Sequence, residues 1–342
     1  MPSKKKNITE LGEKKLIKRL LKRSQTIPFN PTFFDEKSLQ SLSDDAALVD
    51  LGDSYLVVTT DLLLRSAHFP VEMNYQQMGE KIVTVNVSDL AAMGAKPLGI
   101  TIALGLPSDL SINQFDHIVE GIIIACQKYD TPLIGGDTNE STELTLSGTC
   151  LGLVDKDKVL MRSGAQEGDV IAVTGPLGLA AAGFEILLNK SFFKNWDDSL
   201  KENIIKNSLE PVAQLEKGLK LIKSPGVTSA TDISDGLLSE IGEMMDSSPS
   251  KVGVKIFEEL LPIPEEVYQV AENLDKNVLE LALAYGEDFE LLVTIEKDKF
   301  LELQDKIDLQ KIGYITSSGQ IQMVNKEGKT KILREKGYEH FK

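Results

Sequence analysis

The sequence predicts two layered α/β domains, and three observations predict them: the chain length, an ordinary composition, and the alternation of strand-like and helix-like segments. The chain has 342 residues, more than a single hydrophobic core usually supports. Apolar residues make up 42% and charged residues 26%, as in folded globular proteins. Strand and helix patterns alternate along the chain, as layered α/β domains require. The polar stretch Asp155–Lys158 predicts a boundary between a first domain, residues 1–157, and a second, residues 158–342.

The elements of the first half follow from the spacing of apolar residues. Leucine and isoleucine on one face of residues 8–23 predict an amphipathic helix that docks on the rest of the protein, and the β-branched run Tyr55–Asp61 predicts a buried strand. Apolar residues at steps of three and four predict a helix from Gln76 to Met93. We then expect strand 98–106, helix 112–128, a short strand 132–134 that ends before Gly135-Gly136-Asp137-Thr138, and a long strand 145–154.

The second half continues the alternation. Strand 170–174 leads into Gly175-Pro176-Leu177-Gly178, whose glycine offsets differ from those of a dinucleotide-binding turn, so a helix start is the better interpretation. Strand 227–231 ends in Asp232-Ile233-Ser234-Asp235-Gly236, just before a helix over 237–245. The other expected elements are a helix ending at 188, helices 200–209 and 214–223, strand 252–257, helices 265–274 and 278–284, strand 290–295, and a final helix and hairpin.

Charge and cysteine content exclude several classes of partner and compartment. A net charge of −15 opposes binding to nucleic acid or to an anionic membrane, because both depend on basic residues that meet phosphate. The basic start Lys4–Lys6 has no apolar segment behind it, so a secretory signal is not expected, and no run reaches the length of a membrane span. Cys126 and Cys150 form neither a disulfide framework nor a metal pair by spacing, which favours a cytoplasmic protein.

Carboxylates set among small or apolar residues recur at six places. Such a residue needs a partner, because burying it unpaired costs several kcal/mol or keeps it protonated. If the six places converge, their negative charge can exist at neutral pH only around hard cations, and oxygen ligands select Mg²⁺ or Ca²⁺. The places are Asp44-Asp45, Thr59-Thr60-Asp61, Ser88-Asp89, Gly136-Asp137, Asp232 to Asp235, and Glu287-Asp288.

Each place also has a structural interpretation. Asp61 at a strand end would start a turn, and an aspartate or serine before helix 237–245 would cap it. Asp89 is harder to explain in this way, because it falls on the buried stripe of its helix. The three histidines, His68, His117 and His340, are too few for a multi-histidine transition-metal centre.

The motifs that usually hold nucleotide phosphates are absent. Gly328-Lys329-Thr330 has Met323 where a P-loop needs its leading glycine, and the protein-kinase motifs are missing. Phosphates must then be held by carboxylate-bound Mg²⁺, by glycine-rich backbone, and by a few basic side chains such as Arg162. This combination favours metal-assisted phosphoryl transfer.

The motifs resemble those of the thiamine-monophosphate kinase family, within the superfamily of aminoimidazole ribonucleotide synthetase. The resemblance runs nearly end to end, and the segments that narrow it to this family are His68-Phe69, Gly286-Glu287-Asp288, and Gly337-Tyr338 with His340-Phe341. The sequence departs from the family pattern at Leu42-Ser43, Arg65-Ser66-Ala67 and Tyr285. These departures concern local backbone and substrate contacts.

The resemblance implies an enzyme that uses ATP to phosphorylate thiamine monophosphate to thiamine diphosphate, with several Mg²⁺ ions, two α/β domains, and a homodimer formed by the N-terminal sheets. It implies ATP contacts by Arg162, Ser234 and the Gly136-Asp137 segment, and substrate contacts by His68, Glu287 and Tyr338. The implied metal ligands are Asp45, Thr59, Thr60, Asp61, Asp89, Asp137, Asp232 and Asp235.

Three alternatives stay open on the sequence alone. The first is another ATP-dependent activity of the same superfamily, although the chain has no cysteine motif near its N-terminus. The second is a nucleotide sensor without catalysis. The third is a two-metal phosphohydrolase, which would consume ATP without an acceptor. A general base is not required for the kinase reaction, because a phosphate monoester is already ionised near neutral pH.

Overall fold

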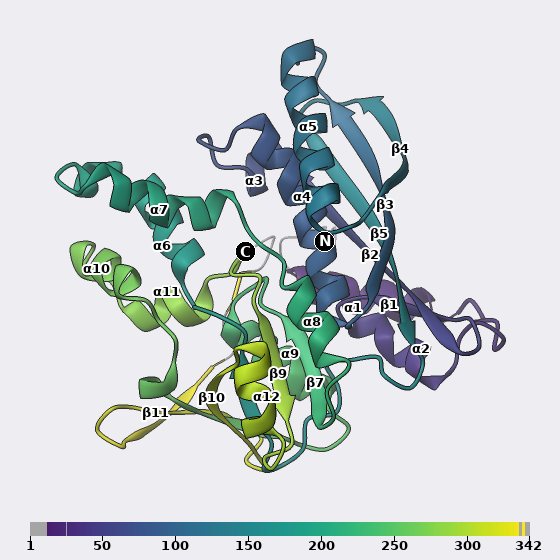
Figure 1. The fold of residues 1–342 in the computed structure, drawn as a ribbon, viewed down its shortest axis with the longest axis vertical. Coiled ribbons are helices and arrows are strands. Elements are labelled where there is room, and N and C mark those ends of the chain that lie inside the picture. The colour runs from purple at the N-terminus through teal and green to yellow at the C-terminus, as the bar shows by residue number, and fades with distance from the viewer. Residues whose placement is uncertain (1–11, 25, 335–336, 339–342) are drawn as a thin grey trace, which may run out of the picture.

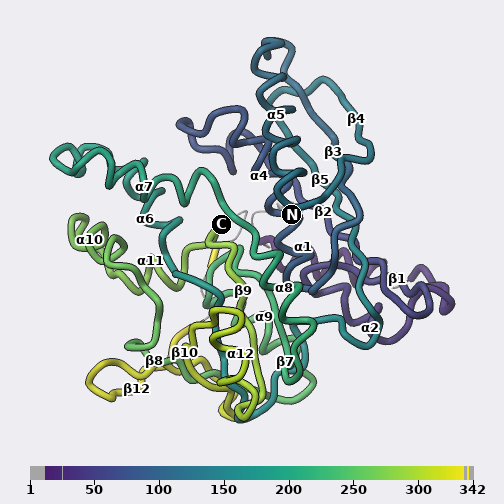
Figure 2. Tube along the Cα trace, viewed as in Figure 1, coloured from purple at the N-terminus to yellow at the C-terminus, as the bar shows by residue number. Residues whose placement is uncertain are grey.

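The computed structural model of the chain describes residues 12–24, 26–334 and 337–338. Within these residues the strands form two sheets, one from each half of the chain. Figure 2 shows the separation: the purple to teal trace occupies one side of the molecule and the green to yellow trace the other. The described residues include no helix that is long and apolar enough to span a membrane.

The first sheet has the strand order β1-β2-β5-β3-β4, and every neighbouring pair is antiparallel except β3 and β4. Its strands are β1 (Ala47–Asp50), β2 (Ser54–Leu64), β3 (Lys96–Leu106), β4 (Leu133–Glu140) and β5 (Thr145–Asp155). The helices of this half are α1 (Glu13–Ser24), α2 (Glu36–Gln40), α3 (Arg65–His68), α4 (Tyr75–Ala92) and α5 (Ile112–Lys128), with a 3₁₀ turn η2 (Ser41–Ser43).

The second sheet has the order β12-β11-β8-β10-β6-β9-β7, with β11 and β8 parallel. Its strands are β6 (Val170–Val173), β7 (Val227–Asp232), β8 (Gly253–Phe257), β9 (Leu291–Ile295), β10 (Gln310–Thr316), β11 (Ile321–Val324) and β12 (Thr330–Leu333). The helices are α6 (Leu179–Leu188), α7 (Asp198–Leu209), α8 (Leu215–Leu221), α9 (Leu237–Ser247), α10 (Glu265–Asn273), α11 (Val278–Ala284) and α12 (Phe300–Ile307), with 3₁₀ turns η3 (Lys190–Phe193) and η4 (Glu258–Leu260).

Helix α4 joins the two halves. Asn74 caps it, Gln77 completes a capping box, and most of its residues are buried. It packs against α5, β2 and β5 of its own half, and against α8 and β7 of the other (Figure 1). The contact with α8 is close, because a Cβ on Gly218 would lie 2.2 Å from the carbonyl oxygen of Ala91. Residues on α4 can therefore contact both halves at once.

Two predicted strands have different ends in the structure. The strand predicted to end at Asp61 continues to Leu64, so Asp61 lies inside β2 and not at its end. The glycine pair predicted to follow a short strand lies within β4, because pairing with β3 extends that strand to Glu140. Both predictions were wrong, since each strand continues along its neighbour beyond the residues with strong strand propensity.

The predicted N-terminal helix begins at Glu13 in the structure, and residues 8–11 lie outside the described part of the chain. Helix α1 has no buried residue, and Ile17 and Leu20 on it are half or more exposed. Lys14 forms an ion pair of 2.7 Å with Glu243 on α9. The helix therefore lies against the second half through charged contacts, and its apolar face is largely open.

Candidate active site

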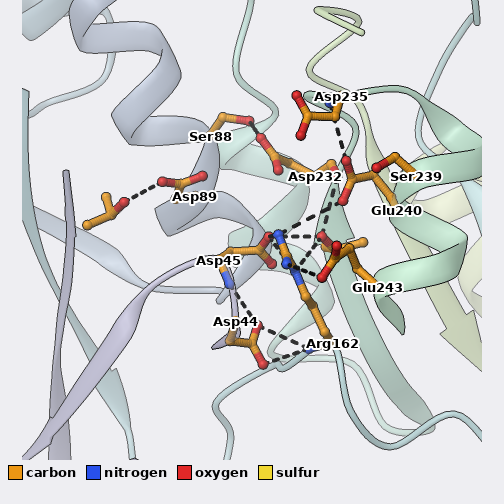
Figure 3. A network of polar contacts seen from close by, with 12 residues as sticks. Asp44, Asp45, Ser88, Asp89, Arg162, Asp232, Asp235, Ser239, Glu240 and Glu243 are labelled. Atoms are coloured by element: carbon orange, nitrogen blue, oxygen red, sulfur yellow. Dashed lines mark hydrogen bonds and ion pairs between the residues drawn. The ribbon is translucent and has the colours of Figure 1, made fainter. Parts of the chain in front are cut away.

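Acidic side chains from both halves gather where α4 meets β2, β7 and the start of α9 (Figure 3). Asp44 and Asp45 precede β1, while Asp61 lies on β2 and Asp89 on α4. Asp232 ends β7, and Asp235 follows it in the loop before α9. We call these six residues the carboxylate cluster.

Arg162 supplies positive charge to this cluster. Its Nη2 and Nε donate to Oδ1 of Asp45 at 2.6 and 3.0 Å, and its backbone N–H donates to the carboxylate of Asp44. The guanidinium also lies 3.9 Å from Glu240 and 3.6 Å from Glu243 on α9. The hydrogen bonds of the side chain use only Nε and Nη2, so the guanidinium keeps N–H donors for a further anionic partner.

Two hydroxyl groups donate to the remaining carboxylates. Thr59 Oγ1 on β2 donates to Asp89, and Ser88 Oγ on α4 donates to Asp232 at 2.6 Å. The second bond joins residues 144 positions apart and links the two halves directly. Each bond satisfies one oxygen of a carboxylate and leaves the charge uncompensated.

Burial and mutual repulsion raise the pKa values of four carboxyl groups of the cluster. Burial raises the pKa of Asp232 to about 7, assisted by the charge of Asp45. Burial raises the pKa of Asp44 to about 7, again with Asp45, and that of Asp61 to about 6, with Asp235. The pKa of Asp89 lies well above its ordinary value through burial and the nearby charges of Asp61, Asp232 and Asp45.

The donor set fits a hard cation. Oδ2 of Asp45 and Oδ2 of Asp61 are buried, and neither has a hydrogen-bond partner, which is costly for a carboxylate oxygen. Among the described residues, no three His, Cys, Asp or Glu side chains are arranged to hold one ion by themselves. A site that offers one or two carboxylate oxygens to each ion suits Mg²⁺, because Mg²⁺ keeps several bound waters and takes phosphate oxygens as its other ligands.

Thr60, Gly136 and Asp137, which were also predicted as site residues, lie away from the carboxylate cluster. Successive residues of β2 face opposite sides of the sheet, so Thr59 and Asp61 face α4, whereas Thr60 donates to the carbonyl of Gly148 and contacts Thr149 on the other side. Gly136 and Asp137 are exposed on the edge strand β4. Residues paired across neighbouring strands lie on the same face of a sheet. The register pairs Asp137 with Ala103, Ala103 with Ser147, and Ser147 with Leu62. Leu62 lies two residues after Thr60 on β2, so Asp137 lies on the face of Thr60.

The residues predicted to contact the substrate lie near one another. The ammonium of Lys81 on α4 donates to both carboxylate oxygens of Glu287 and to the carbonyl of His68. Tyr338 donates its backbone N–H to the carbonyl of Asp235. Burial raises the pKa of its phenol, assisted by the charges of Glu13, Asp235 and Glu287. His340 and Phe341 lie outside the described residues.

The loop that carries Glu287 docks on the loop that carries Ser234. Glu287 and Phe289 donate their backbone N–H groups to the carbonyls of Ser234 and Ile233, at 2.8 and 3.0 Å. A Cβ on Gly286 would lie 1.9 Å from the carbonyl oxygen of Ser234, so only glycine allows this approach. The backbone thus brings Glu287, predicted to contact the substrate, next to Ser234, predicted to contact ATP.

Sequence reasoning missed Lys81 and Glu240. Glu240 on α9 is 2% exposed, accepts from the backbone N–H of Asp235, and has a pKa well above its ordinary value because of burial. Lys81 lies three residues after Met78 on the buried stripe of α4, so the argument that singled out Asp89 would also have found it.

Comparison with known proteins agrees with this arrangement. Residues 43–154 match the family model of the AIR synthase related protein N-terminal domain, and residues 166–325 match that of its C-terminal domain. The thiamine-monophosphate kinase of Pyrococcus horikoshii is 34% identical over 310 residues, which cover 91% of this chain and 94% of that protein.

Solved structures extend the agreement to three dimensions. The structure described as AaThiL complexed with AMPPCP and TMP has a TM-score of 0.85 and 29% identity, and the match covers 99% of this chain and 100% of that one. Thiamine monophosphate kinase from Aquifex aeolicus has a TM-score of 0.77 and 27% identity over 95% and 99% of the two chains. The chain therefore belongs to the AIR synthase related proteins and, among them, to the thiamine-monophosphate kinase family.

Proposed function

We propose that this protein is a thiamine-monophosphate kinase, which transfers the γ-phosphoryl group of ATP to the phosphate of thiamine monophosphate. A phosphate oxygen of the acceptor forms a bond to the γ-phosphorus, the bond from that phosphorus to the β–γ bridging oxygen breaks, and ADP leaves. The observation that carries the proposal is the carboxylate cluster, which joins acids from both halves of the chain. In its first-half part, one buried oxygen of Asp45 and one of Asp61 have no hydrogen-bond partner. Transfer would be direct and in line, since no side chain is required as an intermediate carrier.

Magnesium ions are part of this proposal. Asp45, Asp61, Asp89, Asp232 and Asp235 would hold them together with Thr59, and bound Mg²⁺ would neutralise the negative charge of the two phosphates that must approach each other. We extend the metal ligands to Thr60 and Asp137, for which the support is the family resemblance and not the geometry of the single chain.

Nucleotide and acceptor would enter from different sides of the cluster. Arg162, Ser234 and the Gly136-Asp137 segment would bind ATP, and His68, Glu287 and Tyr338 would bind thiamine monophosphate. The half-exposed Tyr338 ring and the partly exposed Glu287 carboxylate suit a positively charged heteroaromatic ring such as thiazolium.

We also propose that the chain works as a homodimer in the cytoplasm, with domains of residues 1–157 and 158–342. One face of the first sheet has no helix packed on it in Figure 1. The register of β2 and β5 places Leu62 and Leu153 on the face of Thr60, opposite α4, and they are 55% and 38% exposed. All eight residues of the edge strand β4 are exposed as well. A second copy that covers this face would shield both features. The free thiols of Cys126 and Cys150 suit a reducing compartment.

The test is a scan of phosphate acceptors with ATP and Mg²⁺. We expect turnover with thiamine monophosphate, and loss of at least about 100-fold in kcat for Asp89→Asn, which keeps shape and removes charge. The matched control is Asp53→Asn, an exposed aspartate in the turn before β2, which should keep full activity. Metal-loaded protein that is inert with thiamine monophosphate but active with another acceptor would refute the proposal. ATP loss without any acceptor would favour the phosphohydrolase.

A further inference from the structure

Lys81 is a fully buried ammonium group at the junction of the two halves. Its side chain is 0% exposed, whereas that of its partner Glu287 is 26% exposed. The ammonium donates to Glu287 Oε1 at 2.7 Å, to Glu287 Oε2 at 2.6 Å and to the carbonyl of His68 at 3.0 Å. An ammonium has three N–H donors, so these contacts use all of its capacity.

Lys81 and its two partners come from separate elements of the structure. Lys81 lies on α4, His68 ends α3, and Glu287 lies 206 residues away from Lys81 in the loop between α11 and β9. The His68 ring accepts the backbone N–H of Leu64 at Nδ1, so in the neutral ring the proton sits on Nε2. Helix α4 is buried along most of its length, so the ammonium is held on a rigid support.

The backbone around Glu287 is strained and therefore needs such support. Glu287 and Phe289 adopt φ values of +71° and +50°, a region that side chains other than glycine rarely occupy. Two backbone hydrogen bonds, to Ser234 and Ile233, hold only part of this strained loop, and they do not set the direction of the Glu287 side chain. Lys81 does so by holding both carboxylate oxygens.

We propose that Lys81 is a positioning residue for the phosphate acceptor: it sets the Glu287 carboxylate and the His68 turn at the spacing that the cationic acceptor requires. This inference rests on the proposed function for the identity of the acceptor. Lys81 cannot contact a ligand itself, because it is fully buried. It also weakens the attraction of Glu287 for a cation by neutralising part of its charge, so its contribution is geometric and not electrostatic.

That distinction makes the direction of the effect a test. Lys81→Met keeps most of the length of the side chain and removes its charge. If charge governed binding, the substitution would free the negative charge of Glu287 and lower KM for thiamine monophosphate. We expect the opposite, a rise of about 10- to 100-fold in that KM with KM for ATP unchanged, because the carboxylate loses its fixed direction.

A double-mutant cycle with Glu287→Gln provides the second test. If Lys81 acts through Glu287, the double variant should bind thiamine monophosphate no more weakly than Glu287→Gln alone. The double variant also removes the carboxylate charge that Lys81→Met leaves without its partner, so it keeps the test valid if Lys81→Met alone folds poorly. The control is Lys190→Met: Lys190 is 65% exposed, pairs with Glu72 at 2.5 Å across the same two halves, and should leave both KM values unchanged.

Hydrogen exchange gives a readout that does not depend on activity. Lys81→Met should increase exchange at the amides of Glu287 and Phe289 and leave the core of β9 protected. Unchanged KM values, an equal rise in both KM values, additive effects in the cycle, or unchanged exchange at these amides would each overturn the proposal. If the wild-type protein does not phosphorylate thiamine monophosphate, the proposed function fails, and hydrogen exchange still decides whether Lys81 holds the Glu287 loop.

Discussion

Asp232→Asn is expected to stabilise the metal-free protein at alkaline pH while it abolishes catalysis. Asp232 is 1% exposed, and its pKa is raised to about 7 by burial and by the charge of Asp45. Between the ordinary value near 3.8 and about 7, the unfolded chain releases this proton and the folded protein keeps it. Stability therefore falls as pH rises through this window, and the loss is complete above pH 7. An asparagine at this position does not titrate, so the variant escapes the loss.

The magnitude follows from the size of the pKa shift. At about 1.4 kcal/mol per pH unit, a rise from 3.8 to about 7 corresponds to roughly 4 kcal/mol as an upper bound. The charges of Asp45 and Asp61 act on Asp232, and the charge of Asp232 acts on Asp89, so removing one charge relieves only part of this cost. We expect a gain of about 2 kcal/mol at pH 8 and less than about 0.5 kcal/mol at pH 4.

Urea unfolding in the presence of a chelator measures this gain. The free energy of unfolding is compared for wild type, Asp232→Asn and the exposed control Asp53→Asn, at pH 4 and pH 8. Added Mg²⁺ should restore stability to the wild type at pH 8 and should have a smaller effect on Asp232→Asn. A variant that is less stable than wild type at pH 8, or a gain of equal size at both pH values, would refute the reasoning.

Three further predictions concern other parts of the molecule. Gly286→Ala should lower the free energy of unfolding by about 2–3 kcal/mol in urea titrations, because the new methyl group would lie 1.9 Å from the Ser234 carbonyl. In the control Gly135→Ala the methyl group meets only Thr101, at 3.7 Å, so the free energy of unfolding should change little. Arg162→Lys should raise KM for ATP by about tenfold in steady-state assays, since an ammonium cannot reproduce the two-nitrogen contact with Asp45 that orients this side chain. An unchanged KM for ATP would exclude a nucleotide contact by Arg162. Leu62→Glu should convert a dimer into monomers in sedimentation experiments. The control Leu188→Glu, at a residue 76% exposed on α6, should stay dimeric. If Leu62→Glu forms a dimer as stable as that of the wild type, the sheet face is not the interface.

The sequence by itself determined most of the elements and the chemical type of the site. The α5 prediction, residues 112–128, was confirmed at both ends, because its apolar spacing and its Ser111 cap are local signals. Acids placed among small residues at Asp89 and Asp232 indicated buried carboxylates, and both prove to be desolvated with raised pKa values. These features depend on a few residues that are close in the sequence, so the spacing of apolar residues is enough to predict them.

Only the tertiary structure decided which of these residues meet. The alternation of β2 separates Thr60 from Thr59 and Asp61, and the register of β3 and β4 carries Asp137 to the face of Thr60. The bond from Ser88 to Asp232 spans 144 residues, and that from Lys81 to Glu287 spans 206. Local patterns indicate that a charged residue is buried, but its partner depends on how sheets register and helices dock over such distances. The sequence therefore determined the donors, and the packing of α4 between the two halves decided their arrangement.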